Sequence, residues 1–298
     1  MAKIAFIGVG SLGSCIAFEA AANGIADQLV FIDTNQRLAE GQAADIVQSA
    51  CLENDVEVMA GDYSDLAGSD IAVISAGRPR TPEIKTRLEL AQVNYPIIKS
   101  ISERLKGFGG VVITLTNPMD ICNYFAWKFS GLERERVIGS GSLLDTTRFR
   151  ALLSHMFKCP PSHVSAQVIG EHGDSQVPLF SRVRIAGERK EFDTAQRENI
   201  TMQLLTRAME VIAKKGSTIY APARSTYCMI ENVLRGKGGS ICSVVLEGEY
   251  GQRGVSIGAP VELGNKGVEK VKELALDPWE KARFEKGAAV LKGEIARL

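Results

Sequence analysis

A glycine-rich turn close to the N-terminus constrains the fold more than any other feature. It runs from Gly8 to Gly13 as Gly-Val-Gly-Ser-Leu-Gly, between the apolar run Lys3–Ile7 and an apolar segment with helical spacing. Gly8 permits a tight turn, Gly10 lets the backbone approach a pyrophosphate, and Gly13 lets the helix pack close to the strand. The start of the helix adds free N–H groups and a partial positive charge. The turn therefore predicts the first unit of a dinucleotide-binding fold.

An acidic residue supports this interpretation. Asp33 closes the second apolar run, twenty residues after Gly13, where a carboxylate accepts hydrogen bonds from the adenosine ribose. Its charge would repel a 2′-phosphate, so we expect NAD rather than NADP; the nearest downstream cation is Arg37. FAD or S-adenosylmethionine bound through a similar turn remains the alternative. The turn residues predicted to contact the cofactor are Gly8, Val9, Gly10, Ser11, Leu12 and Gly13.

The order of apolar segments predicts an α/β fold. Short β-branched runs alternate with helix-like segments in the first half, which is typical of a parallel sheet covered on both faces. We expect a doubly wound Rossmann parallel sheet over residues 1–143, followed by an α+β substrate and catalytic domain over residues 144–298. The expected strands of the first half are Lys3–Ile7, Gln28–Ile32, Val56–Ala60, Ile71–Ser75, Val111–Leu115 and Val137–Ile138. The expected helices are Leu12–Asn23, Gln36–Ala50, Leu88–Lys106 and Met119–Lys128.

The second half has a different pattern, without internal repeats or a linker. A helix over Leu144–Phe157 precedes a strand, Val164–Ile169, and a strand pair on either side of Ala186-Gly187-Glu188. Two long helices follow, Thr194–Lys214 and Tyr220–Leu234. The last expected elements are the strands Ile241–Leu246, Val255–Ala259 and Val261–Leu263 and a helix, Pro278–Arg297. We expect the two halves to pack tightly together.

Composition excludes several classes of protein. Lys plus Arg and Asp plus Glu both number 35 in 298 residues, so no basic surplus points to nucleic acid or an anionic membrane. The sequence contains no signal-peptide pattern and no apolar run of about 20 residues that would span a membrane. The six cysteines are scattered without a Cys-x-x-Cys pair, so we expect neither disulfides nor a metal site. These features indicate a cytoplasmic protein.

Three short segments carry side chains suited to hydride-transfer chemistry. Thr116–Asp120 follows an expected strand, where ligands bind in an open α/β sheet. Leu144–Arg150 places two charged residues three positions apart on one helix face. Ile169–Ser175 contains a histidine between glycines, just after a strand. Each segment has an ordinary structural explanation, as a turn, a surface ion pair or a loop histidine, so these residues alone indicate a redox enzyme or another NAD-binding protein.

Oxidation of a 2-hydroxyacid needs groups of known character. An imidazole, here His172, takes the hydroxyl proton near neutral pH. A carboxylate, Asp145, orients and stabilises the imidazolium. A guanidinium, Arg148, binds the substrate carboxylate through two parallel hydrogen bonds. A loop arginine polarises the carbonyl oxygen in the reverse reaction, and Asn117 adds a donor to that oxygen.

The motifs, their order and their spacing resemble the lactate/malate dehydrogenase family along essentially the whole chain. The resemblance is greatest to the lactate-dehydrogenase-like malate dehydrogenases of archaea and bacteria. The matching landmarks are Gly8–Gly13, Asp33, Ala76-Gly77, Thr116-Asn117-Pro118, Gly141–Phe149, Gly170–Ser175 and Lys215–Thr218.

The resemblance implies a role for each matching residue. His172 would be the proton acceptor, Asp145 its partner, and Arg148 the anchor of the substrate C1 carboxylate. Arg87 would polarise the reacting oxygen when a mobile loop closes, and Thr218 would line the substrate pocket. The residues expected to contact the cofactor beyond the glycine turn are Asp33, Asn94, Leu115, Thr116 and Asn117, the last also reaching the substrate.

Substrate choice depends on the loop that ends at Arg87. Pro79–Pro82 resembles the Pro-Arg-Lys-Pro of the malate enzymes, in which the arginine binds the second carboxylate of malate; lactate dehydrogenases of the family carry Gln there. Arg80 and Arg87 are seven positions apart, one more than is usual in the family, and Glu83-Ile84 replaces Gly-Met. Counting forward selects Arg80, and counting back selects Thr81. The forward count is preferred, because a mobile loop absorbs an extra residue more easily than an anchored strand.

The sequence therefore predicts an NAD-dependent malate dehydrogenase that interconverts (S)-malate and oxaloacetate, as in the tricarboxylic acid cycle. Lactate or another 2-hydroxyacid is the nearest alternative substrate. A catalytically silent NAD-binding protein is an alternative of another class, and a metal- and NAD-dependent glycosidase is disfavoured by Thr116 where that enzyme needs a cysteine. The family resemblance also implies a homodimer or homotetramer.

Overall fold

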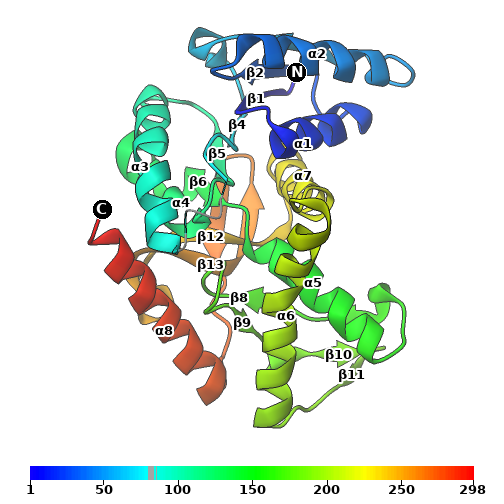
Figure 1. The fold of residues 1–298 in the computed structure, drawn as a ribbon, viewed down its shortest axis with the longest axis vertical. Coiled ribbons are helices and arrows are strands. Elements are labelled where there is room, and N and C mark those ends of the chain that lie inside the picture. Colours follow the sequence, from blue (N-terminus) through cyan, green and yellow to red (C-terminus); the bar gives the residue numbers. More distant parts are fainter. Residues whose placement is uncertain (80–83, 85) are drawn as a thin grey trace.

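The structure, a computed structural model, describes residues 1–79, 84 and 86–298. Eight α-helices lie within this described part of the chain (Figure 1). The helices are α1 (Ser11–Ala22), α2 (Gln36–Ala50), α3 (Arg87–Arg104), α4 (Met119–Ser130), α5 (Ser142–Met156), α6 (Thr194–Lys215), α7 (Tyr220–Leu234) and α8 (Pro278–Ile295). Short 3-10 helices are η1 (Tyr63–Leu66), η2 (Arg134–Arg136), η3 (Pro161–His163), η4 (Phe180–Arg182) and η5 (Glu249–Gly251).

One large sheet spans both halves of the chain. Its strands are β1 (Lys3–Ile7), β2 (Gln28–Ile32), β3 (Glu57–Ala60), β4 (Ile71–Ile74), β5 (Val111–Thr114), β6 (Val137–Gly139), β12 (Gly239–Glu247), β13 (Arg253–Gly264) and β14 (Gly267–Val271). The first six are parallel in the order β3-β2-β1-β4-β5-β6, and β12 continues the sheet antiparallel to β6. This is the strand order of a doubly wound dinucleotide fold. The predicted fold class is confirmed.

Helices cover the central strands, which is why those strands are apolar throughout. All four residues of β4 are fully buried, as are the last four of β1 apart from a trace at Ile7. α1 packs against α2 and α7, while α3 packs against α4 (Figure 1). Strands buried on both faces leave the loops at their carboxyl ends as the place for polar chemistry.

The second half adds short strands and its own apolar cluster. The remaining strands are β7 (Val164–Ser165), β8 (Val168–Ile169), β9 (Val177–Pro178), β10 (Arg184–Ile185) and β11 (Glu188–Arg189). A buried cluster around Phe149 and Phe180, whose rings meet edge to face, lies apart from the main core. The main core contains residues from both halves, so the boundary expected after residue 143 stays a prediction. In the described part of the chain, no helix has the length and apolar character needed to cross a membrane.

Three expected strands differ from those observed. The run Val164–Ile169 forms β7 and β8, which belong to different small sheets. The two runs on either side of Pro260 form a single strand, β13, in which Pro260 pairs with Ile241 of β12. On its other side β14 ends at Val271, and the carbonyl of Pro260 accepts a hydrogen bond from the N–H of the next residue, Lys272. The missing N–H of proline is therefore tolerated at this position. β14, a short strand at the edge of the sheet, was not predicted.

Candidate active site

The glycine turn has the geometry that its sequence predicts. Gly8 has φ of +92°, and a Cβ there would lie 2.5 Å from the backbone nitrogen of Ala76. A Cβ on Gly13 would overlap the carbonyl oxygen of Gly8. Gly10 differs from both, since nothing lies within 4 Å of a Cβ built on it. Gly8 and Gly13 are therefore required by packing, whereas the space beside Gly10 is free for a ligand.

Asp33 connects the turn to the end of β2. Its Oδ2 accepts a hydrogen bond from the N–H of Val9 at 2.9 Å, and its Oδ1 accepts one from the N–H of Asn35 at 2.9 Å. The half-buried carboxylate lies beside the N-terminus of α1, which no side chain caps. Uncapped N–H groups suit a pyrophosphate, and the carboxylate retains lone pairs for ribose hydroxyls. These residues fit a bound dinucleotide.

Asn94 fastens together two loops at the carboxyl ends of β4 and β5. Its amide nitrogen donates to the carbonyls of Arg78, at 3.1 Å, and Asn117, at 2.7 Å, while its amide oxygen accepts from the N–H of Arg78 at 2.8 Å. Thr116 adds a hydrogen bond to the carbonyl of Ala76 at 2.7 Å. Asn94 is fully buried, so its observed role is to shape this edge; its contact with the cofactor stays a prediction.

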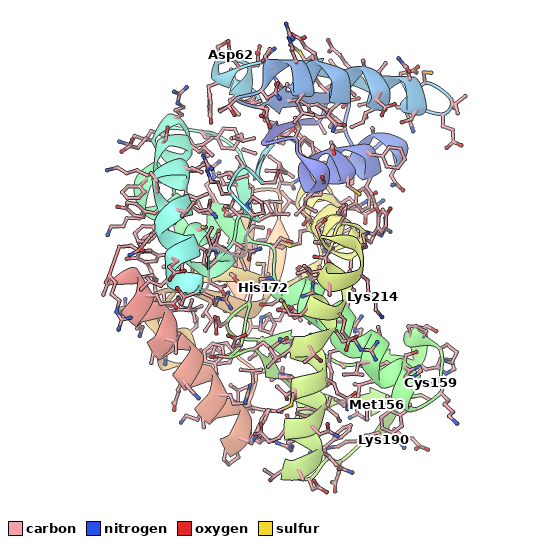
Figure 2. The ribbon with its side chains drawn as sticks, in the orientation of Figure 1. Asp62, Met156, Cys159, His172, Lys190 and Lys214 are labelled. Carbon is pink, nitrogen blue, oxygen red and sulfur yellow. The ribbon has the colours of Figure 1, made fainter. Side chains whose placement is uncertain are left out.

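His172, Asp145 and Arg148 form a connected group. Nδ1 of His172 lies 2.7 Å from Oδ2 of Asp145, and Nη1 of Arg148 lies 3.2 Å from Oδ1 of the same carboxylate. Asp145 is almost fully buried, while His172 and Arg148 keep 16% and 18% of their side chains exposed. His172 lies near the centre of the molecule (Figure 2). Its ring passes over Gly141, where a Cβ would come within 2.6 Å of the imidazole Cγ.

This environment favours the protonated imidazole. Burial alone would lower the pKa of His172, but the charge of Asp145 and the hydrogen bond to it raise the pKa above its usual value. Asp120 adds to this effect, and Arg148 opposes it. The arrangement suits a group that accepts a proton from a substrate hydroxyl and returns it in the reverse reaction.

Arg87 reaches the histidine turn from the first residue of α3. Its Nη1 lies 2.9 Å from Oε1 of Glu171, and its Nη2 donates to the carbonyl of His172 at 2.6 Å. A Cβ on Gly173 would overlap this guanidinium. Thr86 caps the helix, accepting from the N–H of Glu89 at 3.1 Å. The cap fixes the start of α3 and therefore the position from which the side chain of Arg87 extends.

The remaining predicted residues are less closely connected. Leu115 follows β5, and its N–H bonds the carbonyl of Ile74 at 2.8 Å. Thr218 is half-buried between α6 and α7, and among the described residues it forms no hydrogen bond with the other predicted site residues. Arg80 and Thr81 lie outside the described residues.

Two residues at the site were missed by the sequence reasoning. Asp120 accepts a hydrogen bond from the N–H of His172 at 2.6 Å, and Glu171 holds Arg87. Both lie in the segments that carry Asn117 and His172, but neither was given a role. The available signal was their place in the sequence: Glu171 directly precedes His172, and Asp120 follows Asn117 by three residues.

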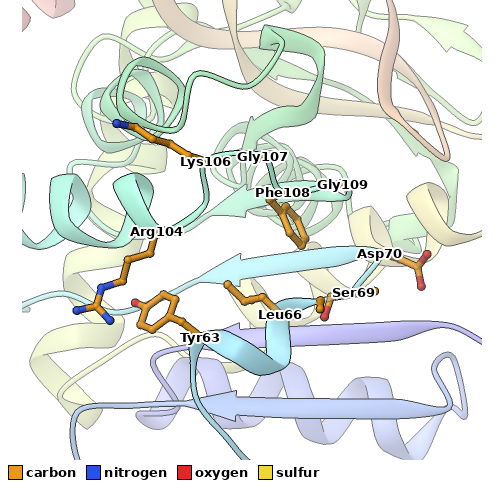
Figure 3. Close-up of a pocket in the computed structure, with 11 residues that line it drawn as sticks. Tyr63, Leu66, Ser69, Asp70, Arg104, Lys106, Gly107, Phe108 and Gly109 are labelled. Carbon is orange, nitrogen blue, oxygen red and sulfur yellow. The ribbon is translucent and has the colours of Figure 1, made fainter.

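Of the cavities in the described part of the chain, two lie at opposite edges of the sheet. One of about 460 Å³, lined by Gly77, Arg78, Pro79, Ile84 and Val93, lies after the carboxyl end of β4, beside α3. The other, of about 490 Å³, lies where β4 and β5 begin and is walled by Tyr63, Arg104 and Phe108 among others (Figure 3). Only the first adjoins the predicted cofactor and substrate residues. No cluster of three or more His, Cys, Asp or Glu side chains suited to a metal ion occurs in the described ranges.

Comparison with known proteins gives the same family over the whole chain. Two protein-family models match the chain. The NAD-binding domain of lactate/malate dehydrogenases matches residues 2–139, and the alpha/beta C-terminal domain of the same family matches residues 142–298. Malate dehydrogenase of Natronomonas pharaonis is 40% identical over 304 residues, covering 100% of both chains. L-lactate dehydrogenase of Geobacillus kaustophilus is 39% identical over 307 residues, covering 99% of this chain and 96% of its own.

Solved structures give the same result. The minor L-lactate dehydrogenase of Enterococcus mundtii superposes with a TM-score of 0.94 at 31% identity, covering 100% of this chain and 98% of its own. Malate dehydrogenase of Cryptosporidium parvum also gives a TM-score of 0.94, at 32% identity and the same coverage. Relatives with either substrate are equally similar, so similarity alone does not choose between malate and lactate.

Proposed function

This chain belongs to the lactate/malate dehydrogenase family, and we propose that within it the chain is a malate dehydrogenase, interconverting (S)-malate and oxaloacetate. It is an NAD-dependent oxidoreductase of that family, with NAD as its cofactor. The proposal concerns the substrate and the roles of individual residues, which the family alone leaves open.

The observation that carries malate over lactate is the residue Arg80. A second substrate carboxylate needs a cation, and a guanidinium binds it through two parallel hydrogen bonds. The forward count that selects Arg80 is supported by Arg78, whose N–H and carbonyl are both held by the buried Asn94. The chain is thus anchored two residues before Arg80. Counting forward from this anchor selects Arg80.

We assign the proton transfer to His172. In malate oxidation its neutral imidazole accepts the hydroxyl proton through Nε2, because Nδ1 is engaged with Asp145. Asp145 fixes the ring orientation and stabilises the imidazolium that forms. NAD, which the glycine turn and Asp33 would hold, would supply the acceptor for the hydride that leaves the hydroxyl-bearing carbon of the substrate. In the reverse reaction His172 returns its proton to the oxygen of oxaloacetate.

The arginines bind and polarise the substrate. Arg148 binds the C1 carboxylate, and its contact with Asp145 keeps the guanidinium near the imidazole. Arg87 polarises the reacting oxygen when the loop before it closes. Asn117 donates to the same oxygen, and Thr218 lines the pocket. The glycine turn and Asp33 hold the pyrophosphate and ribose, with Leu115 and Thr116 beside the rest of the cofactor.

Exchange of the specificity residue tests the proposal. We expect Arg80→Gln to lower kcat/KM for oxaloacetate by about 10²-fold or more, the effect of losing one charged bidentate contact, and to lower kcat/KM for pyruvate far less. Thr81→Gln is the matched control, because the backward count selects that position. An unchanged kcat/KM for oxaloacetate in Arg80→Gln would show that Arg80 is not the specificity residue.

Assembly is also part of the proposal. α6 exposes Met202 and Met209 to 66% and 56%, with Val211 and Ile212 near 40%, and large exposed apolar side chains favour an interface. We propose a homodimer or homotetramer, as the family resemblance implies, and light scattering checks this directly. The cytoplasmic location stays a prediction.

A further inference from the structure

We propose that Asp120 is a second carboxylate partner of His172, holding the backbone of its turn and stabilising positive charge on its imidazole. The inference rests on the proposed role of His172 as proton acceptor. Oδ2 of Asp120 accepts a hydrogen bond from the backbone N–H of His172 at 2.6 Å. Asp145 holds the ring from the other side, through Nδ1. One histidine is therefore held at two points by two buried carboxylates.

The position of Asp120 joins three elements of the fold. It is the second residue of α4 and is only 1% exposed. Its Oδ1 accepts a hydrogen bond from the hydroxyl of Ser243, in β12, at 2.5 Å. Asp120 thus connects α4, β12 and the turn after β8. Because the ring of His172 lies tightly over Gly141, a shift of this backbone displaces Nε2 from the substrate.

The charge of Asp120 acts through a medium with little water. Burial raises the pKa of Asp120 to about 6, although the bond from Ser243 and the charge of His172 work against this. A charge in such surroundings is poorly screened and influences a close neighbour more than a surface charge does. Asp120 contacts the backbone of His172, so it is a positioning residue.

Other titratable and charged groups lie near Asp120 and His172. Glu171, beside His172 in the turn, raises the pKa of Asp120, and the charge of Asp120 in turn raises the pKa of the buried Cys122, two residues further along α4. The groups that face His172 are Asp145 and Arg148 from α5 and Arg87 from α3. None of these replaces Asp120, because none accepts the N–H of His172.

Titration of the histidine itself is the direct test. The chain has three histidines, so nuclear magnetic resonance of histidine-labelled, full-length protein resolves each pKa, with His172→Gln assigning the signal. Asp120→Asn keeps an oxygen for the N–H of His172 and a donor for Ser243, but removes the charge. Two exposed histidines, His155 and His163, serve as internal references.

We expect Asp120→Asn to lower the pKa of His172 by about half a pH unit or more and to leave the other two histidines unchanged. The pH at which the rate of malate oxidation rises should fall by a similar amount. An unchanged pKa of His172 in this variant overturns the proposal. The titration needs no turnover, so it gives its answer even where the malate assignment fails.

A second variant decides the question where Asp120→Asn does not fold. Ser243→Ala removes a hydrogen bond to the charged carboxylate, so Asp120 stays protonated to higher pH and the pKa of His172 falls. Ser256→Ala is the matched control, since Ser256 is equally buried but bonds Asn123 instead. Equal pKa values of His172 in the two serine variants overturn the proposal.

Discussion

The carboxylate of Asp145 lies 2.7 Å from Nδ1 of His172 and raises the pKa of that imidazole against the opposing effect of burial. Asp145→Asn should therefore lower the pKa of His172, because the neutral amide no longer stabilises the imidazolium. The rise of malate oxidation with pH should move to lower pH, and kcat should fall on the order of 10³-fold. Steady-state pH profiles measure both. Full activity with an unmoved profile would exclude the pairing, and the exposed Asp45→Asn on α2 is the control.

Arg148 should not be replaceable by lysine. Arg148→Lys keeps the positive charge but loses the planar fork that binds a carboxylate at two points, together with the contact to Asp145. We expect kcat/KM for oxaloacetate to fall by about 10²-fold, mostly through KM. Arg150→Lys, two residues along the same helix, is the control, since Arg150 bonds the carbonyl of Ala166. Equal losses in the two variants would contradict the assignment of Arg148.

The glycines of the turn should separate binding from stability. Gly10→Ala meets nothing within 4 Å, so the protein should fold normally while its affinity for NADH falls by about tenfold or more. Gly13→Ala overlaps the carbonyl of Gly8 and should lower the free energy of unfolding by about 1–3 kcal/mol. Fluorescence titration and urea denaturation measure the two effects. Wild-type NADH affinity in Gly10→Ala would show that no pyrophosphate approaches there.

Asp120 should make stability depend on pH. Its pKa in the folded protein, about 6, lies above the ordinary value of 3.8, so the folded state binds this proton more tightly than the unfolded state. The resulting contribution to stability is fully present below pH 3.8 and is lost as pH rises through 6. Between pH 4 and 7 the wild type should lose about 2 kcal/mol relative to Asp120→Asn. Urea unfolding at matched protein concentration tests this. A difference between the two proteins that does not change with pH would contradict the expected titration.

The parallel half of the fold could be predicted because its signals are local. The strand before Gly8, the glycine spacing and Asp33 lie within one short stretch, and strands buried on both faces are apolar throughout. The second half was harder. Pro260 looked like a break because proline lacks the N–H that a strand donates, and its pairing with Lys272, twelve residues away, is visible only in the structure. The polar edge strand β14 lacks an apolar run.

The candidate site could be predicted where chemistry demands a residue type. A base, its carboxylate and an anchoring arginine were expected as His172, Asp145 and Arg148, and the structure brings these three together. The contacts of Asp120 and Glu171 could not be predicted, since each joins residues more than fifty positions apart. Such contacts depend on how β5, β8 and α3 meet in space, which no local pattern encodes.

The most direct test of the central claim compares oxaloacetate and pyruvate as substrates of the purified wild-type protein. NADH oxidation is followed by absorbance for each in parallel, with NADPH as a cofactor control. We predict a kcat/KM for oxaloacetate at least about 10²-fold above that for pyruvate, the discrimination expected from one charged contact. A preference for pyruvate would contradict the malate assignment and favour a lactate dehydrogenase with the same His172 site. Turnover of neither substrate would also contradict it, and would point to a different 2-hydroxyacid or to a catalytically silent NAD-binding protein.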